Sequence, residues 1–522
     1  MVAEHREDAS VKFPAGAAFN IVQWTKLKAS APACPETPPP FSADSLAVQP
    51  NHGITCPRPT VVMSAPPTKH FLSGVIEGFY GPPWSRAERL QLFDWLAAWG
   101  LNTYLYAPKD DLKHRALWRE NYSAGEADTL RELIANCRSR QLNFIYALSP
   151  GLDIRYSSAE DLAVLRRRFE QLHSLGCENF ALLLDDIPDR MHAEDAKRWD
   201  SFAAAQCHIA NALSRWAREA SPGARFLFCP TPYCGRMASR QFGGAGYLET
   251  IGRTLATEVD VFWTGPEIIS REITADHIRE LQKLLRRQPL IWDNLFANDY
   301  DGRRFFCGPY SGRPLELREE VSGILVNPNN EFPLNFVPLR TLGHFVNSSG
   351  GWDPSWAYRG ALHEWWPHFA TVGEPPEYDD FESFADYFYL PYEDGPDAER
   401  WFAQVRALLN TTPARWGERA VHFREHTARL RNFCLRLTEL KDRALFAALH
   451  RRVWELREEL DLLDRYVEFK SKPGNAAAPF TSDFHLPLTY RGGLVARLQH
   501  LLVLQPDGTF AARAAGFTEP RI

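Results

Sequence analysis

Short apolar runs with polar tips recur between about residue 70 and residue 350. The runs cover residues 74–79, 103–107, 144–148, 180–184, 226–229, 259–263, 290–292 and 324–326. Amphipathic stretches with helical spacing lie between them; from Asp161 to Leu175, for example, Leu162, Leu165 and Phe169 share one face. Eight strand-like runs that alternate with helices, at about 35 residues per unit, predict a (β/α)8 barrel within the α/β class.

The tips of these runs carry the residues that could do chemistry. In a (β/α)8 barrel the active site lies where the carboxyl ends of the strands meet. The tips carry Gly78 and Tyr80, Lys109, Ser149, Asp185 with Asp186, Cys229 with Tyr233, Thr264, Asp293 with Asn294 and Asp299, and Asn327. Aromatic residues beside fixed hydrogen-bonding groups suit a sugar ring, whose faces are apolar and whose edge is hydroxylated.

The adjacent carboxylates of Asp185 and Asp186 are the most informative of these tips. They close the apolar run 180–184 and are followed by Ile187 and Pro188. Neighbouring buried charges repel and are costly unless each has a partner, so such a pair is typical of two acids with different roles. A lone pair of adjacent aspartates is more often a surface turn or a helix cap. The ordered series of other strand tips favours the functional interpretation.

Composition excludes several classes of protein. The 522 residues carry a formal net charge of -6, which argues against a nucleic-acid binder or a binder of anionic membranes. No apolar run approaches the roughly 20 residues of a membrane span. Nine scattered cysteines indicate a reduced, cytoplasmic protein. Because Cys229 and Cys234 lack ligand partners at zinc spacing, we expect no metal and no cofactor.

The chain divides into three predicted regions. Residues 1–68 are rich in Pro and Ala and predict a disordered leader, with Met63 as an alternative start; residues 69–352 hold the barrel and residues 353–522 a helical C-terminal domain. Helices are expected over residues 398–409, 413–437, 444–466 and 493–504. An apolar excess in the last region predicts a homodimer through the helical domain. It comprises Trp365, Trp366, Phe369, Leu430, Phe433 and Leu437.

Long motifs on the strand ends resemble those of a known family. They are Glu77-Gly78-Phe79-Tyr80-Gly81, residues 102–111, Ser149-Pro150-Gly151, Leu184-Asp185-Asp186-Ile187, Trp263-Thr264-Gly265-Pro266, Trp292-Asp293-Asn294, Ala297-Asn298-Asp299-Tyr300 and Asn327-Pro328-Asn329. Over about residues 71–350 the chain is similar to glycoside hydrolase family 84, which contains protein O-GlcNAcases and related β-N-acetylglucosaminidases. Many relatives have Pro-Thr-Glu-Tyr where this chain has Pro230-Thr231-Pro232-Tyr233, so the turn before the tyrosine is expected to differ.

The resemblance implies substrate-assisted, retaining hydrolysis of β-linked N-acetylglucosamine through an oxazoline intermediate. Asp185 would orient the 2-acetamido group, and Asp186 would act first as acid and then as base. Tyr233 would hydrogen-bond the acetamido oxygen, and Asn294 would brace the acetamide and Asp185.

The resemblance also assigns residues to the rest of the sugar. Lys109 and the carbonyl of Gly78 would face the 3-hydroxyl, while Asp299 and Asn327 would bind the 4- and 6-hydroxyls. The remaining substrate contacts would come from Tyr80, Cys229, Thr264 and Trp292. Asp293, Asp110 and Asp111 are expected to be structural, capping loops or pairing with Lys113 and nearby arginines.

The substrate class stays open at this level. Hydrolysis of O-GlcNAc from Ser or Thr of proteins, or of N-acetylglucosamine from free glycan or glycosaminoglycan fragments, would use the same contacts to the sugar ring. A sugar-binding module without turnover is a third possibility. The intact set of Asp185, Asp186 and Tyr233 disfavours that module, because a protein that only binds has no need of the acid.

Overall fold

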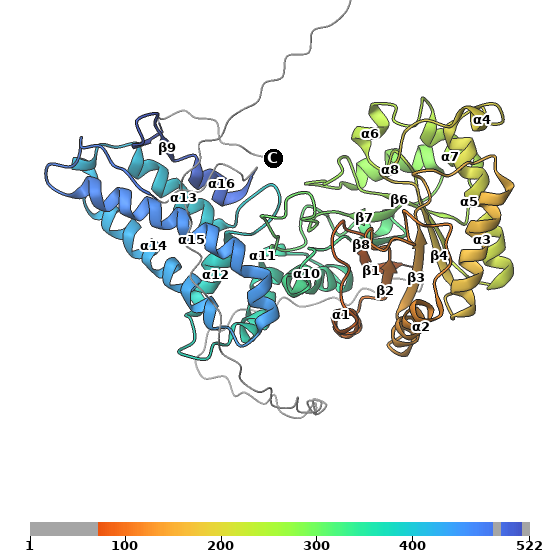
Figure 1. Cartoon of the computed structure of the whole chain (residues 1–522), viewed down its shortest axis with the longest axis horizontal. Coiled ribbons are helices and arrows are strands. Elements are labelled where there is room, and N and C mark those ends of the chain that lie inside the picture. The colour runs from red at the N-terminus through yellow and green to blue at the C-terminus, as the bar shows by residue number, and fades with distance from the viewer. Residues whose placement is uncertain (1–70, 484–491, 514–522) are drawn as a thin grey trace, which may run out of the picture. The chain divides into compact units, whose positions relative to one another are not determined.

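The computed structural model describes residues 71–483 and 492–513 (Figure 1). The predicted leader over residues 1–68, with Met63, lies outside the described residues. Eight parallel strands form a closed barrel in sequence order, and β8 returns to β1 with Leu72 opposite Gly323. The strands are β1 (Leu72–Glu77), β2 (Thr103–Tyr106), β3 (Asn143–Leu148), β4 (Asn179–Leu183), β5 (Phe226–Cys229), β6 (Asp260–Trp263), β7 (Leu290–Asp293) and β8 (Gly323–Val326). This confirms the predicted (β/α)8 barrel.

Helices surround the strands (Figure 1), and several of them begin at a serine or threonine cap. They are α1 (Arg86–Ala98), α2 (Ala124–Ser139), α3 (Ala159–Ser174), α4 (Ala193–Ala196), α5 (Phe202–Ala220), α6 (Gly235–Ser239), α7 (Tyr247–Thr254), α8 (Ala275–Leu285), α9 (Leu317–Glu320) and α10 (Phe336–Asn347). Ser85, Ser158, Ser201 and Thr274 each accept a hydrogen bond from a main-chain N–H in the first turn of their helix. Each cap satisfies one of the donors that a helix start leaves unpaired.

Both faces of the strands are apolar because each packs against a different layer. Inside the barrel the side chains of Ile76, Leu105 and Ala181 belong to one buried cluster. Their strand neighbours Val75 and Phe180 instead join the larger cluster that includes the surrounding helices. The alternation of side chains along a strand therefore divides each apolar run between the barrel interior and the outer core.

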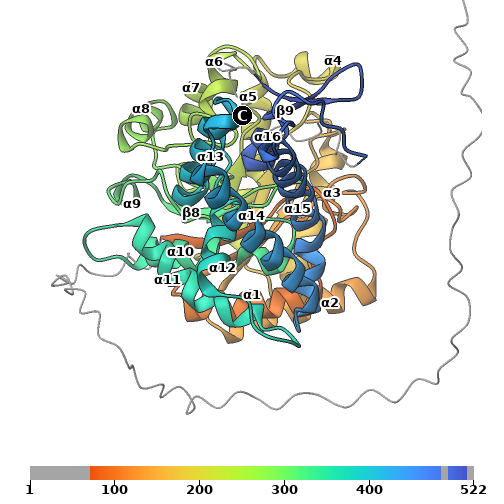
Figure 2. The same cartoon turned by 90° about the vertical axis from the view of Figure 1, so that its left-hand side faces the viewer.

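The helical region, defined here as residues 353–483 and 492–513, follows the barrel. It contains α11 (Pro354–Trp365), η2 (Trp366–Phe369), α12 (Tyr378–Asp386), α13 (Pro396–Leu409), η3 (Pro413–Arg415), α14 (Glu418–Arg436), η4 (Leu437–Glu439), α15 (Arg443–Ser471) and α16 (Gly493–Gln499). Helices α14 and α15 pack side by side (Figure 2). Lys441, just before α15, donates its main-chain N–H to the carbonyl of Ala370 at 2.9 Å.

Two of the predicted helices differ from the structure. The helix expected from Pro413 begins as a 3-10 turn and is interrupted at Gly417, whose φ of 49° places it in the left-handed region. The helix expected over residues 493–504 ends at Gln499, and Leu502–Leu504 forms strand β9 against β10 (Phe510–Ala512). A short apolar run is compatible with either a buried helix or a strand. Here the run forms a strand because β10 lies beside it and pairs with it.

The apolar residues on which the predicted homodimer was based pack against other residues of the same chain. Trp365, Phe369, Leu430, Phe433 and Leu437 are all buried, and Trp366 packs against the same core. The apolar excess therefore forms the interior of the helical region and does not itself indicate a contact with a second copy. In the part of the chain that the structure describes, no helix has the length and apolar character needed to cross a membrane.

Candidate active site

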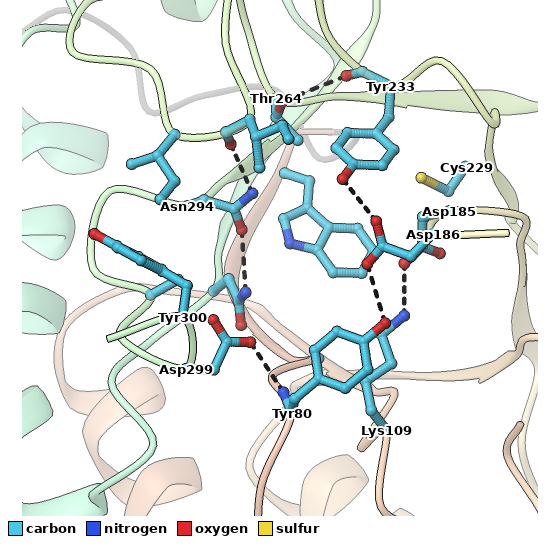
Figure 3. A pocket seen from close by; sticks show the side chains of 16 residues that line it. Tyr80, Lys109, Asp185, Asp186, Cys229, Tyr233, Thr264, Asn294, Asp299 and Tyr300 are labelled. Carbon is cyan, nitrogen blue, oxygen red and sulfur yellow. Dashed lines mark hydrogen bonds and ion pairs between the residues drawn. The ribbon is translucent and has the colours of Figure 1, made fainter. Parts of the chain in front are cut away.

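A pocket of about 390 Å³ opens at the carboxyl ends of the barrel strands (Figure 3). The structure brings all of the sequence-predicted site residues to it. Its lining residues are Gly78, Tyr80, Lys109, Asp185, Asp186, Cys229, Tyr233, Thr264, Ile268, Ile269, Trp292, Asn294, Ala297, Asp299, Tyr300 and Asn327. The volume and the mixture of aromatic and polar groups suit one monosaccharide ring.

Asp185 and Asp186 both line the pocket although they are adjacent in the chain. Successive side chains of an extended strand point to opposite faces, so a regular continuation of β4 would turn one of them away. Asp186 instead has a φ of 50°, which is rare for a residue with a side chain. This left-handed turn lets both carboxylates reach the same cavity. Asp185 is buried there and Asp186 is exposed.

Lys109 holds the charge of Asp185. The Lys109 ammonium lies 2.6 Å from Asp185 Oδ2, and the two side chains are only 2% and 8% exposed. Burial by itself would raise the pKa of Asp185, but Lys109 and then Arg115 outweigh it and lower that pKa below its ordinary value of 3.8. Asp185 is therefore a carboxylate across the physiological range. Within the described residues, its second oxygen, Oδ1, is buried without a hydrogen-bond partner.

Asp186 is held by two tyrosines and one arginine. Tyr233 donates its hydroxyl to Asp186 Oδ1 at 2.8 Å, and Tyr80 donates to Oδ2 at 3.1 Å (Figure 3). Arg115 donates to the main-chain carbonyl of Asp186 at 2.7 Å and to Ser149 Oγ at 3.0 Å. Burial, followed by the charge of Asp186, raises the pKa of Tyr233, so Tyr233 stays a neutral donor.

Two asparagines form the side of the pocket between β6 and β8. Asn294 donates to the carbonyl of Ile268 at 2.8 Å and accepts from Asn327 at 3.0 Å, with no bond to Asp185. These two hydrogen bonds fix the orientation of the side-chain carbonyl of Asn294. Trp292 lies beneath, and a Cβ at Gly78 would come within 2.8 Å of the Trp292 ring, so that position needs glycine. Thr264 donates to the carbonyl of Glu267 at 2.7 Å.

Cys229 and Asp299 lie on different sides of the pocket (Figure 3). Burial, and then the charge of Asp185, raises the pKa of the Cys229 thiol well above its ordinary value, so Cys229 is a neutral, apolar part of the wall. Asp299 Oδ2 accepts the main-chain N–H of Tyr80 at 3.0 Å. Burial raises the pKa of Asp299 above its ordinary value.

Some lining residues were not predicted from the sequence. Ile268, Ile269, Ala297 and Tyr300 come from the loops after β6 and β7. Tyr300 follows Asp299 directly in the motif Ala297-Asn298-Asp299-Tyr300, so that motif could have indicated it as a pocket residue. Arg115 lies 71 positions from Asp186, and nothing in the sequence around it indicates that contact.

Two of the three aspartates expected to be structural, Asp293 and Asp111, have structural partners, while Asp110 is exposed. Asp293 accepts from Arg313 through both of its oxygens at 2.7 Å, and both side chains are fully buried. Asp111 accepts from the hydroxyls of Tyr106 and Tyr122 and from the main-chain N–H of Lys113. The described residues contain no cluster of three or more His, Cys, Asp or Glu side chains suited to a metal ion.

Comparisons with known proteins agree with this geometry. The family model described as beta-N-acetylglucosaminidase matches residues 73–386. The chain is 47% identical to the Protein O-GlcNAcase of Mus musculus over 289 residues, which are 55% of this chain and 31% of that protein. It is also 47% identical to the Protein O-GlcNAcase of Rattus norvegicus over 281 residues, 54% of this chain and 30% of that protein. The chain thus matches about a third of the length of these curated relatives.

A solved structure extends the likeness beyond the barrel. A point mutant of the Thermobaculum terrenum O-GlcNAc hydrolase superimposes with a TM-score of 0.70 at 31% identity. The superposition covers 77% of this chain and 85% of that one. This share is larger than the share of the chain that the mammalian proteins match.

Proposed function

Because the chain belongs to the beta-N-acetylglucosaminidase family, we propose that it hydrolyses terminal β-linked N-acetylglucosamine, removing O-GlcNAc from Ser or Thr of proteins. The observation that carries this proposal is the contrast between two adjacent carboxylates. Asp185 is buried and paired with Lys109, whereas Asp186 is exposed at the mouth of the pocket. One acid is thus kept charged, and the other can exchange a proton with a leaving group and with water.

The closeness of the two acids favours substrate assistance. Most glycosidases place two carboxylates about 5 to 10 Å apart on opposite sides of the scissile bond. Adjacent residues on one strand end cannot flank a bond in that way. If the acetamido oxygen of the sugar attacks the anomeric carbon, no nucleophile from the protein is needed, and both acids can serve from one side.

Asp185 is suited to guide that attack. Its Oδ2 is taken by Lys109, and its buried Oδ1 can accept the N–H of the acetamide. The negative charge of Asp185 then stabilises the positive charge that develops on the acetamide nitrogen. A bond forms between the acetamido oxygen and the anomeric carbon, the bond to the leaving oxygen breaks, and the leaving oxygen takes the proton of Asp186.

The second step returns the proton to Asp186. Water attacks the anomeric carbon of the oxazoline, Asp186 accepts a proton from that water, and the ring opens to restore the acetamide. Two inversions at the same carbon give net retention of configuration. The hydroxyl of Tyr80, which donates to Asp186 Oδ2 in this structure, keeps the carboxyl oriented between the two steps. The hydroxyl of Tyr233 turns from Asp186 Oδ1 to the acetamido oxygen when the sugar binds.

The walls of the pocket divide between the acetamide and the ring hydroxyls. We assign the acetamide side to Tyr233, Asn294, Cys229, Thr264 and Trp292. The neutral thiol of Cys229 and the indole of Trp292 offer apolar surface to the acetyl methyl, while Tyr233 donates to the acetamido oxygen.

The rest of the pocket binds the hydroxyls of the ring. Lys109 and the Gly78 carbonyl face the 3-hydroxyl, and Asp299 and Asn327 bind the 4- and 6-hydroxyls. Asn327 supports this assignment because, among the described residues, its Oδ1 is buried without a partner while its Nδ2 is fixed on Asn294. Tyr80 closes the edge of the pocket between these groups.

A series of aryl β-glycosides tests the proposed nucleophile. Fluorine atoms on the acetyl methyl withdraw electrons from the acetamido oxygen and barely change its size. We expect kcat/KM to fall by about tenfold or more from the acetyl to the trifluoroacetyl substrate, and the first product to be the β-anomer by NMR. Equal rates across the series, or an α-anomeric product, would contradict substrate assistance.

The protein substrate is the finer part of the proposal. It is supported by the names of the relatives, Protein O-GlcNAcase and O-GlcNAc hydrolase. Release of the sugar from a glycosylated Ser peptide is compared with release from a free disaccharide that ends in the same sugar. We expect the peptide to be the better substrate. Efficient cleavage of the disaccharide alone would assign the enzyme to free glycans.

The division at residues 69–352 and 353–522, the homodimer and the cytoplasmic location stay predictions. The homodimer can no longer rest on Trp365 or Phe369, which are buried inside one chain. What still supports it is a set of large apolar side chains exposed on the helical region. They are Trp356, Val372, Val421, Leu435 and Trp454.

A further inference from the structure

The long loop after β7 carries Asp299 and is anchored by a helix of the helical region. We propose that Arg452 of α15 is a positioning residue for the active site, and that it fixes Asp299 through Glu331 and Asn298. This inference rests on the proposed function, in which Asp299 binds a sugar hydroxyl. It gives the helical region a direct part in the recognition of the sugar.

Arg452 makes one of the polar contacts between α15 and the barrel loops, beside the pair of Glu455 with Arg303 of the β7 loop at 3.1 Å. Its guanidinium lies 2.6 Å from Glu331 Oε1 and donates to the carbonyl of Gly302 at 2.9 Å. The Arg452 side chain is 7% exposed and that of Glu331 is 29% exposed. Glu331 follows β8, while Gly302 belongs to the β7 loop. One arginine therefore joins two loops of the barrel mouth to a helix far along the chain.

Glu331 passes this restraint to the residue beside Asp299. Its second oxygen, Oε2, accepts from Asn298 Nδ2 at 2.9 Å. Asn298 is 1% exposed, and its Oδ1 accepts the main-chain N–H of Asn330 at 2.8 Å. The amide of Asn298 is thus fixed at both ends. A peptide unit next to a fixed side chain has little freedom to turn, which restricts Asp299.

The same network closes around Asp299 from the other side. Asn330 Nδ2 donates to the carbonyl of Tyr80 at 2.7 Å, and the N–H of Tyr80 donates to Asp299 Oδ2 at 3.0 Å. Asp299, Tyr80, Asn330 and Asn298 therefore form a ring that is closed by three hydrogen bonds and the peptide bond between Asn298 and Asp299. Arg452 is connected to this ring through Glu331, which contacts both Arg452 and Asn298 directly.

The position of Asp299 identifies the part of the sugar that it meets. In Figure 3 Asp299 lies across the pocket from Asp185 and Cys229. In a pyranose ring C4 is opposite C1, so a sugar with its acetamide and anomeric carbon at Asp185 and Asp186 presents its 4-hydroxyl to Asp299. The carboxylate of Asp299, whose Oδ2 accepts from the main-chain N–H of Tyr80, is thus assigned as the acceptor for this hydroxyl.

The neighbouring residue on α15 provides a matched control. Arg451 has a 62% exposed side chain and pairs with Glu455 at 3.4 Å, one helical turn away. Arg451→Met removes the same charge from the same helix, while it leaves the pair of Arg452 with Glu331 and the pair of Glu455 with Arg303 in place. Glu331→Gln is a second, milder variant, because its amide oxygen can still accept from Asn298 while the ion pair with Arg452 is lost.

The experiment compares kcat/KM for an aryl β-N-acetylglucosaminide with that for its 4-deoxy analogue. We expect wild type and Arg451→Met to prefer the parent sugar by about tenfold, the effect of one hydrogen bond to a charged group. Arg452→Met and Glu331→Gln should reduce this preference to about threefold or less, and Asp299→Ala should abolish it. A smaller folded fraction lowers both rates equally, so the ratio is insensitive to partial unfolding.

The outcomes separate this inference from the proposed function. If wild type cleaves the sugar and Arg452→Met keeps the tenfold preference, or if Arg451→Met loses it equally, the positioning role is refuted and the proposed function stands. If wild type cleaves neither compound, the proposed function fails. Calorimetric affinities for N-acetylglucosamine and its 4-deoxy analogue then decide: a preference that is lost in Arg452→Met and kept in Arg451→Met supports positioning, and an equal ratio in the two variants or no binding refutes it.

Discussion

Replacing Lys109 by methionine tests how Asp185 is kept charged. The ammonium and the carboxylate are 2.6 Å apart and nearly fully buried. At an effective dielectric constant of about 20, their attraction is about 6 kcal/mol, and desolvation of the two ions offsets part of it. Removal of one partner of a buried pair typically costs about 3–5 kcal/mol. Because Arg115 still lowers the pKa of Asp185, we take the lower figure, about 3 kcal/mol.

This free energy has two measurable consequences. The pKa of Asp185 should rise, because Lys109 is the charged group that lowers it most. The acidic limb of kcat/KM against pH should move upward with it, because only charged Asp185 supports the acetamide. Wild-type Asp185 has a pKa below 3.8, so the stability that the pair contributes is present at neutral pH. The difference in unfolding free energy between wild type and Lys109→Met should shrink as the pH falls from the raised pKa of Asp185 in the variant to its lowered pKa in wild type.

Lys113→Met is the matched control. Lys113 lies in the same loop and pairs with Glu126, but the two side chains are 18% and 48% exposed. Such a pair contributes less than about 1 kcal/mol. Chemical unfolding at pH 7 and at pH 3, together with pH–rate profiles, would be measured for both variants. The reasoning is refuted if Lys109→Met resembles Lys113→Met in stability and leaves the acidic limb in place.

Three further predictions concern the chemistry and the assembly. Asp186→Asn should lose most activity on substrates with poor leaving groups, because these need the proton of the acid. Asp185→Asn should lose about 2–4 kcal/mol of transition-state stabilisation whatever the leaving group. Rates would be measured across aryl glycosides of graded leaving-group pKa, and a steep dependence in Asp185→Asn with a flat one in Asp186→Asn would show that the roles are reversed. Exhaustive chelation should leave activity unchanged, and a loss that one divalent ion restores would contradict this. Light scattering at micromolar concentration should give the mass of a homodimer, and a monomer would count against it.

The barrel and its catalytic face could be predicted because their signals are local. Each strand is a short apolar run, and each functional residue follows its strand within a few positions, as Asp185 follows β4 and Asn294 follows β7. The closed order of parallel strands then brings these tips together without further information. The pocket that contains Lys109, Asp186 and Tyr233 follows from that topology.

Contacts between distant side chains could not be predicted in this way. The sequence motif places Lys109 at a sugar hydroxyl, but it does not indicate the ion pair of Lys109 with Asp185, which depends on how the two loops fold. Arg115 and Arg452 act on residues far along the chain, and no local pattern marks either of them. The apolar stripe through Leu430 was equally ambiguous, because the same spacing serves packing within one chain or between two.

The central claim is that the acetamide of the substrate is the nucleophile. The most direct measurement compares kcat/KM for an aryl β-N-acetylglucosaminide with that for the aryl β-glucoside of the same leaving group. An oriented intramolecular nucleophile is a large advantage, so we predict a preference of at least about a thousandfold for the N-acetylated sugar. Comparable rates on the two glycosides would contradict the account.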